Sequence, residues 1–167
     1  MKTLIICRHA KADYPPMVED FARPLKEKGE LDAQKQGKRL AEDGFLPDLI
    51  LSSPANRAIT TANIIAKEIG YRQTIKTDER IYLERAGTLV DIIQDLPSSL
   101  NTVMIFGHNP TLSDAVRMLL NMYNPFEMPT CGMVCLENPF DDWQFSRRNA
   151  ARLRWTLVPR FQRSDNT

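Results

Sequence analysis

The sequence lacks any long apolar run, and no stretch reaches the roughly 18 consecutive apolar residues that a membrane-spanning helix needs. The apolar stretch at the N-terminus is short and is interrupted by Arg8 and His9. It is therefore not typical of a signal peptide, and it predicts a buried strand instead. We expect a cytoplasmic protein that does not insert into a membrane.

An excess of charge of one sign is also missing, because 22 basic and 21 acidic side chains leave a formal net charge of +1. Proteins that bind nucleic acids or anionic membranes usually carry a marked positive excess. We therefore expect neither kind of partner. Any anion-binding site must come from a few basic residues that the fold brings together.

Cysteine is scarce, with only Cys7, Cys131 and Cys135 in the chain. An odd number without a dense framework indicates reduced thiols, as in cytosolic proteins. The spacing of Cys131 and Cys135 and the Asp141-Asp142 pair could suggest a metal site. We interpret them as packing and surface charge, and we expect neither a metal nor a cofactor.

The apolar content is ordinary, at 43% of 167 residues, which is enough for the core of one domain. We predict a single domain over residues 1–160 and a polar, frayed tail over residues 161–167. Short and continuously apolar runs are typical of strands that are covered on both faces. Such runs predict strands over residues 3–7, 48–52 and 102–106, with weaker candidates over residues 74–77, 132–136 and 153–158.

Between these runs, apolar residues recur at helical spacing. The pattern predicts helices over residues 30–43, 55–69, 88–95 and 112–121. Strands that alternate with helices favour an α/β sandwich, in which ligands bind beyond the carboxyl ends of the strands. The proline-rich segment 14–24 and the segment 121–129 are predicted to be irregular, and a loop as long as the first often serves a site.

The only two histidines of the chain, His9 and His108, each follow a predicted buried strand directly. Arg8 precedes the first of them, and Arg57 follows the second strand in the first turn of a predicted helix, away from its apolar stripe. Each residue alone also fits a structural or solvated role. Their joint placement favours a site for a phosphoryl group or another anion, because the planar guanidinium binds phosphate oxygens in pairs.

Several motifs resemble those of one known family. They are Arg8-His9-Ala10, Arg23-Pro24-Leu25, the run from Leu51 to Ala58 with Thr61-Ala62, and Gly107-His108-Asn109-Pro110. In this order they resemble the histidine phosphatase superfamily, which includes phosphoglycerate mutases and acid phosphatases. Ala10 stands where most members have glycine, as in the short SixA-type branch of phosphohistidine phosphatases.

The resemblance implies a phosphoglycerate mutase-like fold, a three-layer sandwich around a central, mostly parallel sheet. It implies that His9 is the nucleophile that accepts the phosphoryl group and that His108 stabilises this group from across the pocket. Arg8 and Arg57 would neutralise the phosphate oxygens. Two further residues at motif positions, Ser52 and Asn109, would support phosphate binding.

The leaving group is the part of the mechanism that the motifs define least. Glu84 stands where relatives that act on alkyl phosphates often carry an acid, and it could protonate a departing oxygen. A solvated glutamate at the start of a helix is the alternative. Phosphohistidine depends less on such an acid, because imidazole leaves readily once it is protonated.

The leading hypothesis is a metal-independent phosphatase that removes phosphate from a histidine of a signalling or phosphotransfer protein. A phosphatase for small phosphorylated metabolites is the first alternative. A non-catalytic module that binds phosphate or a phosphoprotein is a second alternative, of another class, and a mutase is a third. The intact set of Arg8, His9, Arg57 and His108 disfavours the non-catalytic module, because a binding module has no need of a nucleophile.

Overall fold

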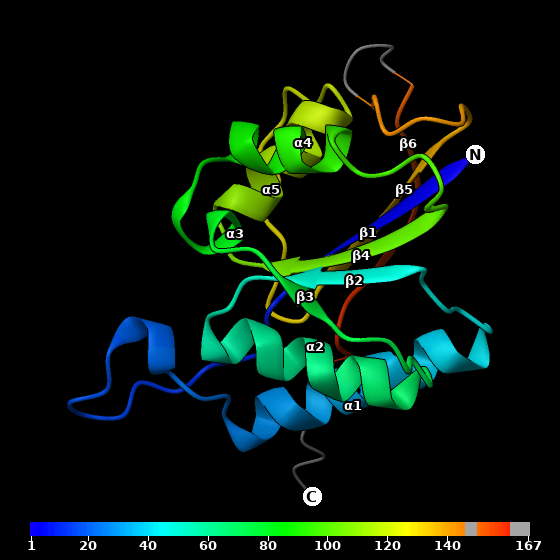
Figure 1. Ribbon diagram of the computed structural model, residues 1–167. Helices are drawn as coiled ribbons and strands as arrows, with labels where there is room; N and C mark the ends of the chain where they lie inside the picture. Colours follow the sequence, from blue (N-terminus) through cyan, green and yellow to red (C-terminus); the bar gives the residue numbers. More distant parts are fainter. Residues whose placement is uncertain (146–149, 161–167) are drawn as a thin grey trace, which may run out of the picture.

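The computed structural model describes residues 1–145 and 150–160, and these residues build one six-stranded sheet with helices on both faces (Figure 1). The strand order is β3-β2-β4-β1-β5-β6. The bounds are β1 Lys2–Arg8, β2 Leu49–Ser52, β3 Lys76–Thr77, β4 Thr102–Gly107, β5 Met133–Asn138 and β6 Arg152–Leu157. The expected frayed tail over residues 161–167 lies outside the described residues.

The sheet is mostly parallel, as the sequence predicts. β1 pairs in parallel with β4, and β2 pairs in parallel with both β4 and β3. The two last strands are antiparallel, β5 to β1 and β6 to β5. β1 lies inside the sheet between β4 and β5, and Leu4, Ile5 and Ile6 are fully buried. The continuous apolar run therefore reflects burial of both faces of the strand.

Two layers of helices cover the sheet. The helices are η1 Asp20–Ala22, α1 Glu27–Glu42, α2 Asn56–Glu68, α3 Arg80–Leu83, α4 Ala86–Gln94 and α5 Thr111–Leu119. α1 and α2 lie on one face, and α3, α4 and α5 lie on the other (Figure 1). Alternate residues of β1 pack into the two hydrophobic cores, one on each face of the sheet. Ile5 packs into the core on the α1–α2 side, and Ile6 packs into the core on the α4–α5 side.

The structure differs from the sequence-based expectation in short elements. The single turn α3 and the three-residue η1 have too few residues to show an apolar period. α1 begins at Glu27, three residues before the predicted start at residue 30. No helix within residues 1–145 and 150–160 is long and apolar enough to cross a membrane.

The strand register brings three chain segments together at one edge of the sheet. Arg8, the last residue of β1, lies opposite Gly107, the last residue of β4. Ser52, the last residue of β2, lies opposite Phe106 on the other side of β4. The residues that follow these strands, among them His9 and His108, therefore emerge beside one another.

The helices α1 and α2 approach closely at Gly37. A Cβ atom at this position would lie 2.7 Å from Cβ of Glu68 and 3.3 Å from Cα of Ile65. Only a residue without a side chain allows this distance between the two backbones. The contact fixes α2 against α1, and α2 carries Arg57.

We expect Gly37→Ala to lower the free energy of unfolding by about 1–3 kcal/mol, because the added methyl group forces the two helices apart. Gly87→Ala in α4 is the control, since, apart from its chain neighbours and the adjacent backbone of its own helix, no described atom lies within 4 Å of the place its added methyl group would take. It should leave the stability unchanged or raise it by up to about 1 kcal/mol through helix propensity. Urea unfolding of both variants measures the difference, and equal effects would contradict the close approach.

Candidate active site

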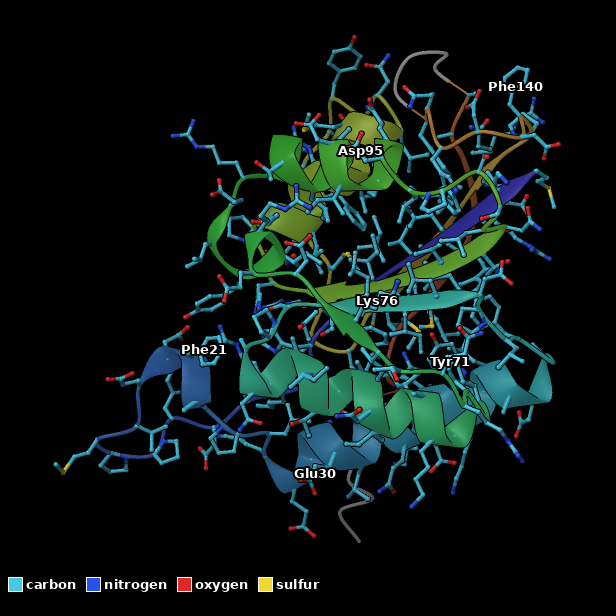
Figure 2. All side chains as sticks on the ribbon, viewed as in Figure 1. Phe21, Glu30, Tyr71, Lys76, Asp95 and Phe140 are labelled. Carbon is cyan, nitrogen blue, oxygen red and sulfur yellow. The ribbon has the colours of Figure 1, made fainter. Side chains whose placement is uncertain are left out.

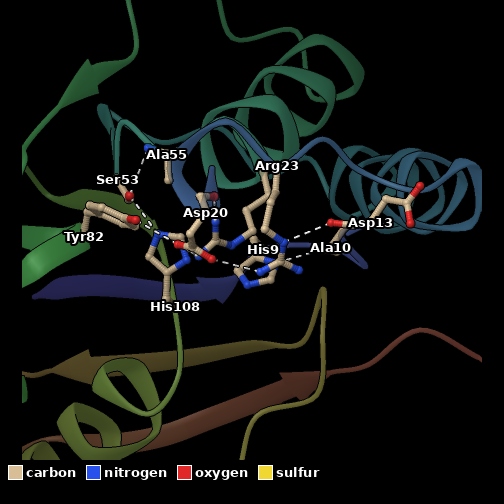
Figure 3. A network of polar contacts seen from close by, with 10 residues as sticks. His9, Ala10, Asp13, Asp20, Arg23, Ser53, Ala55, Tyr82 and His108 are labelled. Carbon is tan, nitrogen blue, oxygen red and sulfur yellow. Dashed lines mark hydrogen bonds and ion pairs between the residues drawn. The ribbon is translucent and has the colours of Figure 1, made fainter. Parts of the chain in front are cut away.

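The two histidines of the chain lie side by side at the carboxyl edge of the sheet (Figure 3). Their ring centroids are 5.2 Å apart, and the rings are tilted by 51°. Only 9% of His9 and 8% of His108 is exposed. The residues are 99 positions apart in the sequence, so the pair depends entirely on the parallel pairing of β1 with β4.

A backbone carbonyl determines which nitrogen of His9 can react. Nδ1 of His9 lies 2.8 Å from the carbonyl oxygen of Ala10. Because a carbonyl oxygen only accepts hydrogen bonds, Nδ1 carries the proton in the neutral ring and Nε2 carries the free electron pair. The backbone of His9 is itself held, donating to Gly107 O and accepting from the N–H of Cys131 at 3.0 Å each. Nε2 is thus a fixed and available nucleophile.

His108 is oriented by a serine. Its Nε2 lies 2.7 Å from Oγ of Ser53, and the same Oγ accepts a hydrogen bond from the N–H of Ala55 at 3.2 Å. The ring of Tyr82 packs edge-on against the ring of His108, with 5.5 Å between the two ring centroids. Nδ1 of His108 is buried and has no hydrogen-bond partner among the described residues. One nitrogen is therefore held by the protein and the other is left for a ligand.

Burial keeps both imidazoles neutral. Loss of contact with water lowers the pKa of His9 to about 4, and the nearby guanidinium groups of Arg57 and Arg8 act in the same direction. The pKa of His108 falls to about 3 for the same first reason, with Arg57 as the next cause. A neutral imidazole is the form that can attack phosphorus.

The two predicted arginines adjoin the histidines and are each held at one end. Nη1 of Arg8 donates to Met128 O at 2.8 Å. Nη1 and Nη2 of Arg57 donate to the backbone and carboxylate oxygens of Asp20 at 2.7 and 3.1 Å. The Nε–H groups of both arginines are buried and have no partner in the described part of the chain. Buried donors without acceptors are rare in proteins, and here they suit the oxygens of a bound oxyanion.

Two of the predicted supporting residues serve the protein frame instead. Oγ of Ser52 donates to Ser53 O at 2.8 Å, and Ser52 is fully buried. Neighbouring residues of a strand point in opposite directions, so Ser53 reaches His108 and Ser52 does not. Asn109 donates to Met128 O and accepts from Ser113, which ties the loop before α5 to the segment near Met128.

Glu84 is not brought to the histidine pair. Glu84 directly follows α3, at the C-terminal end of that helix. Its backbone oxygen accepts a hydrogen bond from the hydroxyl of Thr111. Its side chain is exposed and lines a separate cleft of about 690 Å³ together with Asp114 and Arg117. No contact between its carboxylate and either histidine occurs among the described residues. The expectation that Glu84 protonates the leaving group is not tested by these contacts and stays a prediction.

Three residues that the sequence analysis did not single out as site residues belong to this cluster. Asp20 accepts hydrogen bonds from Arg57, from Nη1 of Arg23 and from the hydroxyl of Tyr82. Arg23 belongs to the Arg-Pro-Leu motif, which could have marked it. Asp20 and Tyr82 stand on short irregular segments without a periodic pattern, and only the folded chain brings them to the site.

No group of three or more His, Cys, Asp and Glu side chains with metal-binding geometry occurs within residues 1–145 and 150–160. The chemistry available from these residues is that of imidazole and guanidinium groups. A nucleophilic nitrogen faces a set of cationic and neutral donors, which suits transfer of a phosphoryl group.

Residues 4–82 match the family model of the histidine phosphatase superfamily (branch 1). The chain is also similar to a solved phosphohistidine phosphatase candidate, SixA of Agrobacterium tumefaciens. The two are 27% identical with a TM-score of 0.81, over 95% of this chain and 98% of the other. The chain therefore resembles the histidine phosphatase superfamily over residues 4–82, and it resembles the SixA candidate over nearly its whole length. Its fold is of the SixA type, which confirms the fold that the motifs implied.

Two curated relatives with higher identity match shorter segments. An uncharacterized protein of Mycobacterium tuberculosis is 32% identical over 106 residues, which is 64% of this chain and 65% of that protein. A 2,3-bisphosphoglycerate-dependent phosphoglycerate mutase of Clavibacter michiganensis is 35% identical over 89 residues, which is 48% of this chain and 36% of the mutase. The chain thus spans less than two thirds of the length of either relative.

We expect the ring of His9 to titrate with a midpoint near pH 4 in the ligand-free enzyme, and that of His108 near pH 3. Since both pKa values are lowered, the neutral rings persist above these values and the nucleophile is lost as the pH falls through about 4. NMR of imidazole-labelled protein measures both midpoints, and His9→Ala assigns the two signals. A midpoint of His9 near the ordinary 6.5 would contradict the proposed cause.

Proposed function

We propose that this protein is a phosphatase that removes the phosphoryl group from a phosphorylated histidine of a signalling or phosphotransfer protein. The observation that carries the proposal is the absence of a proton-donating carboxyl group at the histidine pair within the described residues. Asp20 is the carboxyl that touches the cluster, and hydrogen bonds from Tyr82 and then Arg23 and Arg57 lower its pKa to about 2. An ionised carboxylate cannot protonate a departing alkoxide, whereas imidazole is a good leaving group by comparison.

The reaction takes two balanced steps. Nε2 of His9 uses its electron pair to form a bond to phosphorus, and the bond from phosphorus to the substrate imidazole breaks, its nitrogen gaining a proton from solvent. The positive charge on the phosphorylated ring of His9 is stabilised by the carbonyl of Ala10, which accepts from Nδ1–H. Water then attacks phosphorus, inorganic phosphate leaves, and His9 is restored.

The role of the basic groups is electrostatic. Arg8 and Arg57 carry buried Nε–H groups without partners in the described part of the chain, and His108 carries an Nδ1 in the same condition. In the proposed mechanism these groups stabilise the charge that the oxygens of the phosphoryl group gather during transfer. They need no metal to do so, and none is part of the proposal.

The surface around the site supports a protein as the substrate. Apolar and aromatic side chains are exposed on the loop before α1 and at the end of α3, and we call this set the apolar rim. Its members are Tyr14, Met17, Val18, Phe21 and Leu83, all of them exposed. The loop extends beyond the helices, and Phe21 is borne on it (Figure 2). Phe21 also contacts Tyr82, which in turn contacts His108, so the rim is continuous with the site.

An apolar rim around a cationic centre fits a protein surface that presents a phosphohistidine, because the surrounding apolar area supplies binding energy that a small metabolite cannot use. The three buried cysteines further suit a reducing compartment, and we place the enzyme in the cytoplasm.

Replacing the nucleophile tests the mechanism. We expect His9→Ala to lower turnover at least about a thousand-fold, because no other imidazole occupies that position. Binding of inorganic phosphate should persist, since the guanidinium groups and His108 remain. Turnover of p-nitrophenyl phosphate and calorimetric titration with phosphate measure the two quantities. Unchanged turnover would refute the covalent intermediate and favour another nucleophile.

Comparison of substrates tests the proposed substrate class. We expect a higher kcat/KM for a histidine-phosphorylated phosphotransfer protein than for sugar phosphates. Met17→Asn in the apolar rim should lower kcat/KM for the protein by about tenfold and leave p-nitrophenyl phosphate hydrolysis unchanged. Leu46→Asn, at an exposed leucine on the loop between α1 and β2, is the control. Turnover of small esters alone would show a phosphatase of small metabolites instead.

A further inference from the structure

The carboxylate of Asp20 accepts hydrogen bonds from the donor groups at the outer end of the candidate active site. Oδ2 of Asp20 accepts from Nη2 of Arg57 at 3.1 Å and from the hydroxyl of Tyr82 at 2.8 Å. Oδ1 accepts from Nη1 of Arg23 at 3.1 Å. The three donors come from α2, from α3 and from the loop before α1, and they converge on this one side chain (Figure 3).

The position of Asp20 separates two sets of donors. The side chain of Asp20 is 54% exposed, whereas His9 and His108 are 9% and 8% exposed. Asp20 therefore lies at the mouth and the histidines lie at the base. The donors at the base, Nε–H of Arg8 and of Arg57, remain without partners in the described residues. The donors at the mouth are satisfied by Asp20.

Two guanidinium groups and a phenol at the mouth would otherwise bind a second anionic group of a small substrate. A carboxylate two or three bonds from a phosphate ester is the chemistry that such a donor set recognises. Asp20 supplies this carboxylate from within the chain. An incoming carboxylate would find the donors already paired and a like charge beside it.

We propose that Asp20 is a specificity-determining residue that excludes small phosphorylated acids from the site by occupying the donors of their carboxylate. The proposal rests on the phosphatase site described above and narrows its substrates. A phosphorylated histidine on a protein carries no carboxylate next to the phosphoryl group, and Asp20 does not oppose it. Its imidazole also gains a proton on leaving, so that a negative charge at the mouth is compatible with this leaving group.

Neighbouring charges support this assignment of Asp20. Arg23 does not depend on Asp20 alone, because its Nε donates to Asp13 O at 2.9 Å and its guanidinium lies 3.3 Å from the centre of the Tyr14 ring. Arg57 also keeps its bond to the backbone oxygen of residue 20 at 2.7 Å, which no side-chain change removes. Loss of the carboxylate charge therefore leaves both guanidinium groups near their positions and available to a ligand.

A matched pair of inhibitors tests the proposal in the full-length protein. 3-Phosphoglycerate and glycerol 3-phosphate differ by a carboxylate in place of a hydroxymethyl group. Each is titrated as a competitive inhibitor of p-nitrophenyl phosphate hydrolysis, so neither has to be a substrate. For Asp20→Asn we expect the inhibition constant of 3-phosphoglycerate to fall about tenfold or more, and that of glycerol 3-phosphate to change less than about twofold.

Asp13→Asn is the matched control, because it removes the same charge from the same loop. The carboxylate of Asp13 accepts from the N–H of Tyr14 and lies 4.0 Å from Nζ of Lys26, and it makes no hydrogen bond with Arg57 in the described residues. It should leave the ratio of the two inhibition constants unchanged. An equal shift in both Asp variants would show a general charge effect and would overturn the proposal.

The remaining possible results of the inhibitor titration also test the proposal. Tighter binding of both inhibitors to Asp20→Asn would show that Asp20 competes with the phosphoryl group itself, and weaker binding of both would show that it only positions Arg57. Unchanged constants would show no role in selectivity. Each of these results overturns the proposal. A wild-type enzyme that hydrolyses no phosphohistidine would refute the proposed substrate but would leave this comparison of constants intact.

Discussion

The parallel pairing of β1 with β4 is the interaction on which the rest of the site depends. Its register places the last residue of β1, Arg8, opposite the last residue of β4, Gly107. The next residue of each chain segment is a histidine, so the two rings meet without any contribution from a long loop. A shift of the register by one residue would turn the alternate side chains of the strand to the opposite face and separate the pair.

The second constraint is the balance of charge around the buried rings. Two imidazoles lie among guanidinium groups with little exposure to water, and burial together with these cations keeps both rings neutral. The Nε–H groups of Arg8 and Arg57 have no partner in the described residues, so they can donate hydrogen bonds to an oxyanion. In the proposed mechanism the phosphoryl group supplies the missing negative charge, and His9 is in its neutral, reactive form before the substrate binds.

Asp20 shows how an exposed loop can shape such a site without entering the chemistry. The loop before α1 supplies Asp20 to the mouth and most of the apolar rim to the surface around it, so that one segment contributes both charge and apolar area. In the proposed function, the fold that resembles SixA provides the phosphoryl pocket, and this loop provides the features that distinguish one substrate from another. A division between a rigid base and a variable rim is common among enzymes that share one fold.

The sequence by itself determined the strands that carry the histidines, because a short, continuous apolar run is a local signal of a strand buried on both faces. It also determined that Arg8, His9 and His108 would lie at strand ends and that Arg57 would lie in the first turn of a helix, and the resemblance to a known family named their roles. Only the tertiary structure decided that Ser53 and not Ser52 meets His108, and that Glu84 lies in another cleft. Only it brought Asp20, Arg23 and Tyr82 together. The physical reason is that short turns and loops take their conformation from distant contacts, which leave no periodic pattern in the residues that form them.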